Sequence, residues 1–368
     1  MAADYHDFSS LELSEGLKIL RELTDLTDDE LKILSGSGGL TLESADRMSE
    51  NVVGVTSRTL RIIPGLVVNR RKYIVPLATE QRTIFAMARK GVELSNPSGG
   101  FKTSSTGSIM RGQIQVLEVP DIVKATEQVL ANKEEILREV NTLSRHRKAT
   151  DVIVRSIESE AGPMLIVELL VDVKDSMGAL IINSMCEKVT PLIASLTQGK
   201  VGLRILSNLS TERLVKVETV IEAEILGGNE VVDDIVKAYL FAAADPYRAT
   251  THNKGIMNGV SSVLMATSND TRAVEAGAHA YAALSGRYLP LSKWSKNGDG
   301  NLVGELEMPM AVGIIGGAIS THPTARVVIK MLGIQSATEL GEIAATTGLA
   351  CNLGALYVLV TEGVTSLK

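Results

Sequence analysis

The stretch from Gly112 to Leu209 alternates between strand-like and helix-like periodicity in an order that few folds satisfy. The expected elements are strands at 112–119, 151–159, 164–173 and 201–207, with helices at 121–143 and 177–197. This order is the split βαβ, ferredoxin-like arrangement (βαββαβ), in which both helices pack on one face of an antiparallel sheet. We therefore expect a self-contained ferredoxin-like domain in the middle of the chain.

The rest of the chain requires a second, larger domain around this insert. With 368 residues, the protein is too long for one ordinary hydrophobic core. The segment from about Leu340 to Val360 is apolar nearly all round, which predicts a buried central helix. The expected fold class is α+β: a large mixed α/β domain with a central apolar helix, interrupted by the ferredoxin-like domain. The expected limits are a helical segment of the large domain at 1–50, its first part at 51–108, the ferredoxin-like domain at 109–209 and the second part of the large domain at 210–368.

Charge and composition exclude nucleic acid as a partner. The 37 basic residues are outnumbered by 43 acidic residues, for a net charge of -6, so the chain lacks a basic field for a phosphate backbone. The ferredoxin-like segment also contains no Phe, Tyr or Trp on which bases could stack.

The sequence shows no pattern of a secreted or membrane-bound protein. Its first residues, MAADYHDFSS, are acidic and polar, unlike a secretory signal. The longest apolar stretch, Met308 to Ile319, is shorter than the ~18–20 residues that cross a bilayer. The two cysteines, Cys186 and Cys351, lie far apart with no neighbouring His/Cys cluster, which argues against a disulfide framework or a structural zinc site. We expect a cytoplasmic protein with no metal and no membrane contact.

The densest polar cluster is DPYRATTHNKGIMNG at 245–259, followed by Asp270 eleven residues later. We expect this cluster to be a polar loop between two apolar segments. A lysine near a carboxylate can stabilise a developing alkoxide, and a guanidinium can clamp a substrate carboxylate. The alternative, a solvated loop with a surface Lys–Asp pair, carries equal weight.

Signatures of common nucleotide-binding folds are missing. The sequence contains no G-x-G-x-x-G after a strand and no G-x-x-x-x-G-K-[ST]. Gly178 falls in the first turn of an expected helix, where a phosphate can bind, but by itself this position favours an ordinary capped helix. Glu80 falls at the start of another expected helix, beginning at Thr79, where a carboxylate is favourably placed.

Five segments together resemble one known family. They are ENVVG at 50–54, DSMGA at 175–179, RILSNL at 204–209, DPYRATTHNKGIMNG at 245–259 and EMPMAVGIIGGAISTHP at 307–323. In this combination the sequence closely resembles 3-hydroxy-3-methylglutaryl-coenzyme A (HMG-CoA) reductase, in the form of the class II, bacterial and archaeal, branch. The resemblance runs from about Leu11 to Gly363.

The resemblance implies an NAD(P)H-dependent oxidoreductase of the mevalonate (isoprenoid) pathway. It would convert HMG-CoA to mevalonate and coenzyme A with two hydrides from a nicotinamide cofactor bound on the ferredoxin-like domain. By similarity, Lys254 stabilises the carbonyl oxyanion, Asp270 orients that lysine, and Glu80 supplies or relays the proton. Arg248 and Asn258 hold the HMG group. The cofactor contacts carried over are Asp175, Met177, Gly178, Asn183 and Asn208.

The basic segment SRHRK at 144–148 bears on the choice of cofactor. Ser144 and Arg145 resemble the place where NADP-using members contact the 2′-phosphate, and a cationic pocket favours that extra charge. NADPH is therefore favoured over NADH, with a solvated basic turn as the alternative.

Several positions depart from the family pattern. Glu80 is followed by Gln81 and Arg82 where the family usually has Pro-Ser, so Arg82 either clamps the HMG carboxylate or blocks its site. Cys351 stands where class II members commonly carry a glutamine, and Leu180 replaces an asparagine.

The largest departure follows TEG at 361–363. In class II relatives this segment leads to a Gly-His pair, whose histidine protonates the departing thiolate, and then to a mobile flap that excludes water. The sequence ends at Lys368 with neither, which suggests a truncated chain or a divergent member without the flap. The competing hypothesis is a catalytically impaired homologue that binds a coenzyme A thioester or a nucleotide, or that acts as an oligomer scaffold.

The resemblance also implies an oligomer. ENVVG resembles a region that builds the family's dimer, in which each active site takes groups from both chains. The expected partners are HMG-CoA, mevalonate, coenzyme A and a second copy of the chain, in a homodimer or a higher multiple of dimers.

Overall fold

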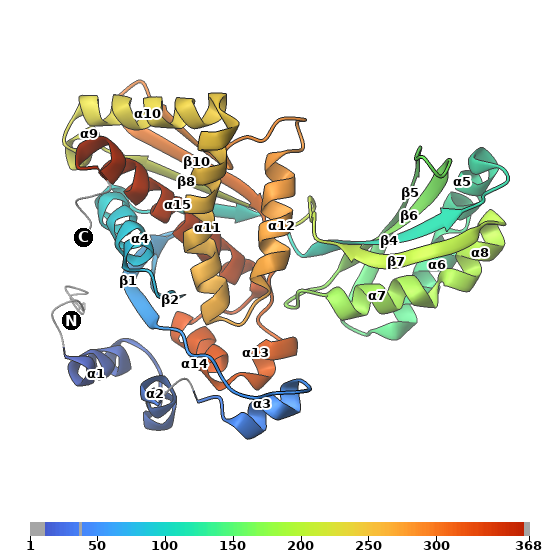
Figure 1. Ribbon diagram of the computed structural model, residues 1–368, viewed down its shortest axis with the longest axis horizontal. Helices are drawn as coiled ribbons and strands as arrows, with labels where there is room; N and C mark the ends of the chain where they lie inside the picture. Colours follow the sequence, from blue (N-terminus) through green and yellow to red (C-terminus); the bar gives the residue numbers. More distant parts are fainter. Residues whose placement is uncertain (1–11, 37–38, 364–368) are drawn as a thin grey trace.

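The computed structural model describes residues 12–36 and 39–363. Figure 1 shows two bodies, a large helix-rich one and a smaller one made of β4 to β7 and α5 to α8. The smaller body contains one antiparallel sheet in the order β5-β6-β4-β7. Its elements are β4 (Ile109–Leu117), α5 (Ile122–Ala131), α6 (Lys133–Val140), β5 (Lys148–Ile157), β6 (Met164–Asp172), α7 (Ala179–Lys188), α8 (Thr190–Thr197) and β7 (Lys200–Ser207).

This arrangement confirms the ferredoxin-like prediction. Alternate residues of β4 are buried, including Met110 and Ile114, and form a core of their own with the helices. Each predicted helix is, however, broken into two. The first break lies at Asn132, and the second at Val189 just before Pro191, whose ring cannot continue a helix from the preceding turn.

The large body is built on a second antiparallel sheet, in the order β3-β8-β10-β9. A separate hairpin, β1 with β2, turns at Asn69 and Arg70, both with positive φ, as tight hairpin turns require. The strands are β1 (Leu60–Val68), β2 (Arg71–Ala78), β3 (Lys102–Ser105), β8 (Leu214–Ile221), β9 (Ser292–Lys296) and β10 (Leu302–Pro309). The helices around them are α4 (Arg82–Ser95), α9 (Ala223–Leu226), α10 (Asn229–Ala244), α11 (Pro246–Ala266), α12 (Thr271–Ala282), α13 (Gly317–Thr321), α14 (Pro323–Leu332) and α15 (Ala337–Thr361).

The N-terminal part of the described chain is helical, as expected. Three short helices, α1 (Leu13–Leu23), α2 (Asp28–Ser35) and α3 (Leu42–Met48), lie along one end of the large body (Figure 1). Leu20 and Leu26 anchor this segment in a small apolar cluster that also contains Val328 of α14.

Helix α15 forms the centre of the large body. Its most apolar stretch is long enough to span a membrane, yet 78% of that window is buried inside the protein, so α15 serves as a core helix. The central apolar helix predicted from the sequence is thereby confirmed. The prediction that Met308 to Ile319 is the longest apolar stretch was wrong, because α15 contains a longer one that is interrupted by scattered Thr and Glu residues.

Glycines allow α4 and α11 to pack very closely on α15. A Cβ at Gly91 of α4 would lie 1.9 Å from the carbonyl oxygen of Ala350. A Cβ at Gly259 of α11 would lie 2.4 Å from the carbonyl oxygen of Thr347. The backbones at these crossings touch without side chains between them, which fixes the three helices relative to one another.

The prediction that 245–259 is a polar loop was wrong, because these residues open helix α11. The side chain of Asp245 caps the helix by accepting from the Arg248 N–H, and Pro246 occupies the first turn, where its missing N–H costs nothing. The polar residues recur every three or four positions, so they form one face of a helix whose other face is buried.

Candidate active site

Helix α11 presents three of the six predicted substrate and catalytic residues, Arg248, Lys254 and Asn258. Arg248, Thr251, Lys254 and Asn258 are three or four residues apart and therefore share one face. Arg248 and Asn258 are half-buried, whereas Lys254 is exposed and forms no ion pair with any residue that the structure describes. The ammonium of Lys254 is thus available to an incoming oxyanion.

Lys254 faces the crossing of α15 and the start of α4. Its positive charge acts on the buried thiol of Cys351, whose Sγ lies 4.0 Å from the carbonyl oxygen of Ile84. Burial dominates, and raises the pKa of Cys351 to about 12, despite the opposing effects of Lys254 and of a backbone hydrogen bond at Gly259. Three helices therefore converge beside Lys254.

Glu80 and Arg82 lie at the entrance to this crossing. Glu80 belongs to the connection between β2 and α4, and its Oε1 is 3.5 Å from Nη1 of Arg58. Arg82 is the first residue of α4, and both side chains are exposed. Both side chains are therefore accessible to a ligand at the surface, Glu80 beside its ion pair with Arg58.

Asp270 lies away from Lys254 in the same chain. It caps α12 by accepting from the Ala273 N–H at 3.1 Å, and its Oδ1 is 3.5 Å from Nε of Arg272. The Asn269 N–H donates to the carbonyl oxygen of Leu264 at 2.9 Å, which places the neighbouring Asp270 near the end of α11, ~15 Å of helix rise beyond Lys254. One protomer therefore does not bring Lys254 and Asp270 together.

The predicted cofactor residues of the DSMGA segment pack against the large body. Oδ1 of Asp175 accepts from the Ala337 N–H at the start of α15 at 2.9 Å. Gly178 is the N-cap residue of α7 with φ of 95°, and no side chain caps that helix. Met177, beside them, is half-buried. The free N–H groups at the start of α7 form a site where an anion can bind.

The remaining cofactor candidates lie on α7, at the end of β7 and in the turn before β5. Oδ1 of Asn183 accepts from the Leu206 N–H at 3.0 Å, which fixes α7 on that strand. Asn208 follows β7, and its backbone packs against Gly277 of α12. Ser144 accepts from the N–H groups of His146 and Arg147, while Arg145 is exposed in the same turn.

Sequence reasoning missed a buried polar chain behind the α11 face. Trp294 Nε1 donates to Oδ1 of Asn352, which also accepts from Ser292 Oγ, so Ser292 Oγ in turn accepts from His252 Nε2. His252 is buried and neutral, because burial, with the nearby positive charge of Arg248, lowers its pKa to about 4. The sequence contained one signal for this series of hydrogen bonds, the position of His252 near Lys254, because Ser292, Trp294 and Asn352 lie far away in sequence.

Comparisons with known proteins show the family of the chain. The family model for hydroxymethylglutaryl-coenzyme A reductase matches residues 12–366. The chain belongs to this family. It is 46% identical over 369 residues to the HMG-CoA reductase of Archaeoglobus fulgidus, covering 99% of this chain and 84% of that one. It is 32% identical to the probable HMG-CoA reductase of Borreliella burgdorferi over 86% of this chain and 74% of that one.

A solved reductase has the same fold. The class II HMG-CoA reductase from Streptococcus pneumoniae, bound to NADPH in open conformations, superposes with a TM-score of 0.94 at 36% identity, over 97% of this chain and all of that one. The predicted family and fold class are thereby confirmed, and the reductase hypothesis is favoured over that of a non-catalytic homologue. The prediction about a C-terminal flap concerns residues from 364 onward, which lie outside the described residues.

Proposed function

We propose that this HMG-CoA reductase converts HMG-CoA to mevalonate and coenzyme A with reduced nicotinamide cofactor as the electron donor. The supporting observation within the structure is the exposed Lys254 on the polar face of α11, beside the crossing of α4 and α15. The thioester carbonyl takes up one hydride and a proton to give a hemithioacetal. Its C–S bond then breaks while its hydroxyl proton passes to the departing thiolate, which gives the aldehyde and the coenzyme A thiol. The aldehyde takes up a second hydride and a proton. HMG-CoA is the proposed substrate, and a nicotinamide dinucleotide the proposed cofactor.

The chain's residues fit a nicotinamide dinucleotide. The uncapped start of α7 at Gly178 offers backbone N–H groups to a pyrophosphate, and a side chain at that positive φ would also meet Val173 at 2.4 Å. Asp175 has one carboxylate oxygen bound to Ala337 and a second one for a ribose hydroxyl. When bound, the cofactor supplies the hydrides. The proposed contacts are Asp175, Met177, Gly178, Asn183 and Asn208.

The proposed chemistry of the protein is electrostatic and acid–base. The Lys254 ammonium stabilises negative charge on the carbonyl oxygen as the hydride arrives, because a fixed cation close to a developing alkoxide lowers the barrier. Glu80 supplies or relays the proton to that oxygen. Arg248 and Asn258, on the same face of α11, hold the HMG group, and Arg82 binds its carboxylate at the start of α4.

We propose that each active site is shared between two protomers. Because Asp270 follows the end of α11, ~15 Å of helix rise beyond Lys254, we expect it to orient the lysine of another chain and not its own. In a twofold dimer, Lys254 of each chain can face Asp270 of the other, which gives two equivalent sites. The assembly is then a homodimer or a multiple of dimers, in the cytoplasm.

The cofactor phosphate is proposed to bind at the 144–148 turn. Arg145 is exposed there, and the neighbouring Ser144 is half-buried, with its Oγ accepting from two backbone N–H groups. This supports NADPH over NADH. The 2′-phosphate is absent from NADH, which leaves the cation without a partner.

The test follows the absorbance of reduced nicotinamide during incubation with HMG-CoA, first with NADPH and then with NADH. Lys254→Ala should lose at least about a hundredfold in kcat, because it removes the cation at the oxyanion. Lys237→Ala is the control, since Lys237 is an exposed lysine of α10 that pairs with Asp234. Oxidation independent of HMG-CoA, or equal in both variants, would refute the proposed function.

A further inference from the structure

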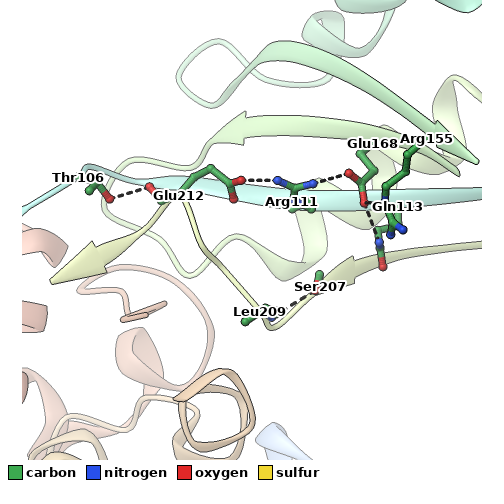
Figure 2. Close-up of polar contacts among 8 residues, drawn as sticks. All are labelled: Thr106, Arg111, Gln113, Arg155, Glu168, Ser207, Leu209 and Glu212. Atoms are coloured by element: carbon green, nitrogen blue, oxygen red, sulfur yellow. Dashed lines mark hydrogen bonds and ion pairs between the residues drawn. The ribbon is translucent and has the colours of Figure 1, made fainter. Parts of the chain in front are cut away.

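The chain passes from the large body to the smaller one after Ser105 and returns after Ser207. The two connecting segments are hydrogen-bonded to each other. Thr106 Oγ1 donates to the carbonyl oxygen of Glu212 at 2.8 Å, and Arg111 of β4 pairs with both Glu212 and Glu168 (Figure 2). Glu168 also pairs with Arg155 at 3.1 Å within the smaller sheet. The carboxylate of Glu212 thus links the returning segment, 208–213, to the ferredoxin-like sheet.

The next residue, Arg213, links the same returning segment to the DSMGA segment. Its side chain is 3% exposed, with Nη1 donating to the carbonyl oxygen of Ser176 at 3.2 Å and Nη2 to that of Val312 at 2.6 Å. No carboxylate among the residues 12–36 and 39–363 forms an ion pair with it. Burial lowers the pKa of Arg213 to about 10, against the opposing charges of Asp175 and Asp172.

Ser176 and Val312 belong to two backbones that touch at this point. The Ile314 N–H donates to the carbonyl oxygen of Asp175 at 2.9 Å. A Cβ at Gly313 would lie 2.9 Å from the Met177 nitrogen, so only glycine fits there without a shift. Arg213 therefore clamps the 172–178 loop of the smaller body onto the 310–314 segment of the large body.

A buried guanidinium without a carboxylate partner is costly, because main-chain carbonyl oxygens offset only part of its lost hydration. The guanidinium instead provides a fixed geometry, since its planar fork holds the carbonyl oxygens of Ser176 and Val312 at the same time. Both carbonyls belong to the segments that carry or support Asp175, Met177 and Gly178. Together with the Ala337 and Ile314 N–H groups that bond Asp175, Arg213 thus sets the position of these three groups relative to the large body.

We propose that Arg213 is a positioning residue for the nicotinamide cofactor, holding the 172–178 loop where its groups meet the dinucleotide and align it with the substrate on the large body. The inference rests on the proposed function. Arg213 touches neither substrate nor cofactor and acts through the loop. Its loss should weaken cofactor binding and leave the binding of HMG-CoA, which uses α11, nearly unchanged.

The test compares variants of the full chain by steady-state kinetics and by the fluorescence of bound NADPH. Arg213→Met keeps an unbranched apolar stem and removes both hydrogen bonds, so KM and Kd for NADPH should rise about tenfold, with KM for HMG-CoA within about twofold of wild type. Arg213→Lys keeps the charge but not the fork and should lie in between. Gly313→Ala pushes the two backbones apart by another route and should shift KM for NADPH in the same direction.

Arg155→Met is the matched control, because it removes an arginine of the same ferredoxin-like sheet that does not contact the 172–178 loop. It should leave KM for NADPH within about twofold of wild type. The proposal is overturned if folded Arg213→Met binds NADPH like wild type, or if both KM values rise together. If Arg213→Met fails to fold, the same criteria apply to Arg213→Lys and Gly313→Ala. A wild-type protein that neither binds nor oxidises NADPH would refute the proposed function itself, whereas an active wild type with unaffected variants would refute the role of Arg213 alone.

Discussion

The Sγ of Cys351 lies 4.0 Å from the carbonyl oxygen of Ile84, so the middle of α15 directly meets the first turn of α4. Lys254 of α11 is close enough to act electrostatically on the same thiol. The buried crossing of three helices thus supports the surface on which the substrate is proposed to bind. A change in this crossing should therefore reach the proposed active site.

The close packing of α11 on α15 can be tested by substituting two glycines of α11, Gly259 and Gly255. Gly259→Ala would place a Cβ 2.4 Å from the Thr347 carbonyl oxygen, and should lower the free energy of unfolding by about 1–3 kcal/mol through overpacking. Gly255→Ala meets nothing within 4 Å, and should raise it by about 0.5–1 kcal/mol, since alanine favours helix. Urea unfolding measures both. Equal effects of the two substitutions would contradict the close contact between α11 and α15.

Neither cysteine should react with iodoacetamide in the folded protein. Burial raises the pKa of both Cys351 and Cys186 to about 12, so at pH 8 about one thiol in ten thousand is ionised, and reagent cannot reach it. Intact mass spectrometry should show no adduct on native protein and two after unfolding in guanidinium. An adduct on native Cys351 would mean that the crossing opens to solvent.

The free energy of unfolding should decrease as the pH is lowered, because His252 is buried in its neutral form. Its folded pKa of about 4 lies below the unfolded value of about 6.5, so the unfolded chain binds more protons between these values. Its full contribution is present above pH ~6.5 and is lost as the pH falls to ~4, by at most about 3 kcal/mol. His252→Asn should flatten this part of the curve measured by chemical unfolding. His146→Asn, at an exposed position, should keep the wild-type slope, and a wild-type slope in His252→Asn would disprove the prediction.

Some of this architecture followed from local sequence, and some did not. Period-two and period-3.6 patterns predicted the ferredoxin-like order and the central helix, because those signals lie within single elements. The helix at 245–259 was mistaken for a loop since its polar residues were counted as a cluster, although their spacing matches a helix face. The bond from Asp175 to Ala337 joins residues 162 positions apart, and the Arg213 clamp joins three segments. Such contacts are set by tertiary packing, which no local pattern records.

Cofactor preference should depend on Arg145. Arg145→Ala removes the cation proposed to meet the 2′-phosphate, so KM for NADPH should rise about tenfold, while KM for NADH stays unchanged. Steady-state kinetics with each cofactor, at saturating HMG-CoA, measures the effect. Arg138→Ala, an exposed arginine of α6 near Glu135, serves as the control. Equal changes with both cofactors would place the phosphate elsewhere.

The most direct test of a reductase site shared between chains mixes two inactive variants. Lys254→Ala and Asp270→Ala, each inactive alone, are unfolded together and refolded, and HMG-CoA-dependent oxidation of NADPH is measured. Random pairing makes half of the dimers mixed, each with one intact site of two, so activity should return to about one quarter of wild type. A mixture that stays inactive, although mixed dimers are shown by mass spectrometry, would contradict the shared site.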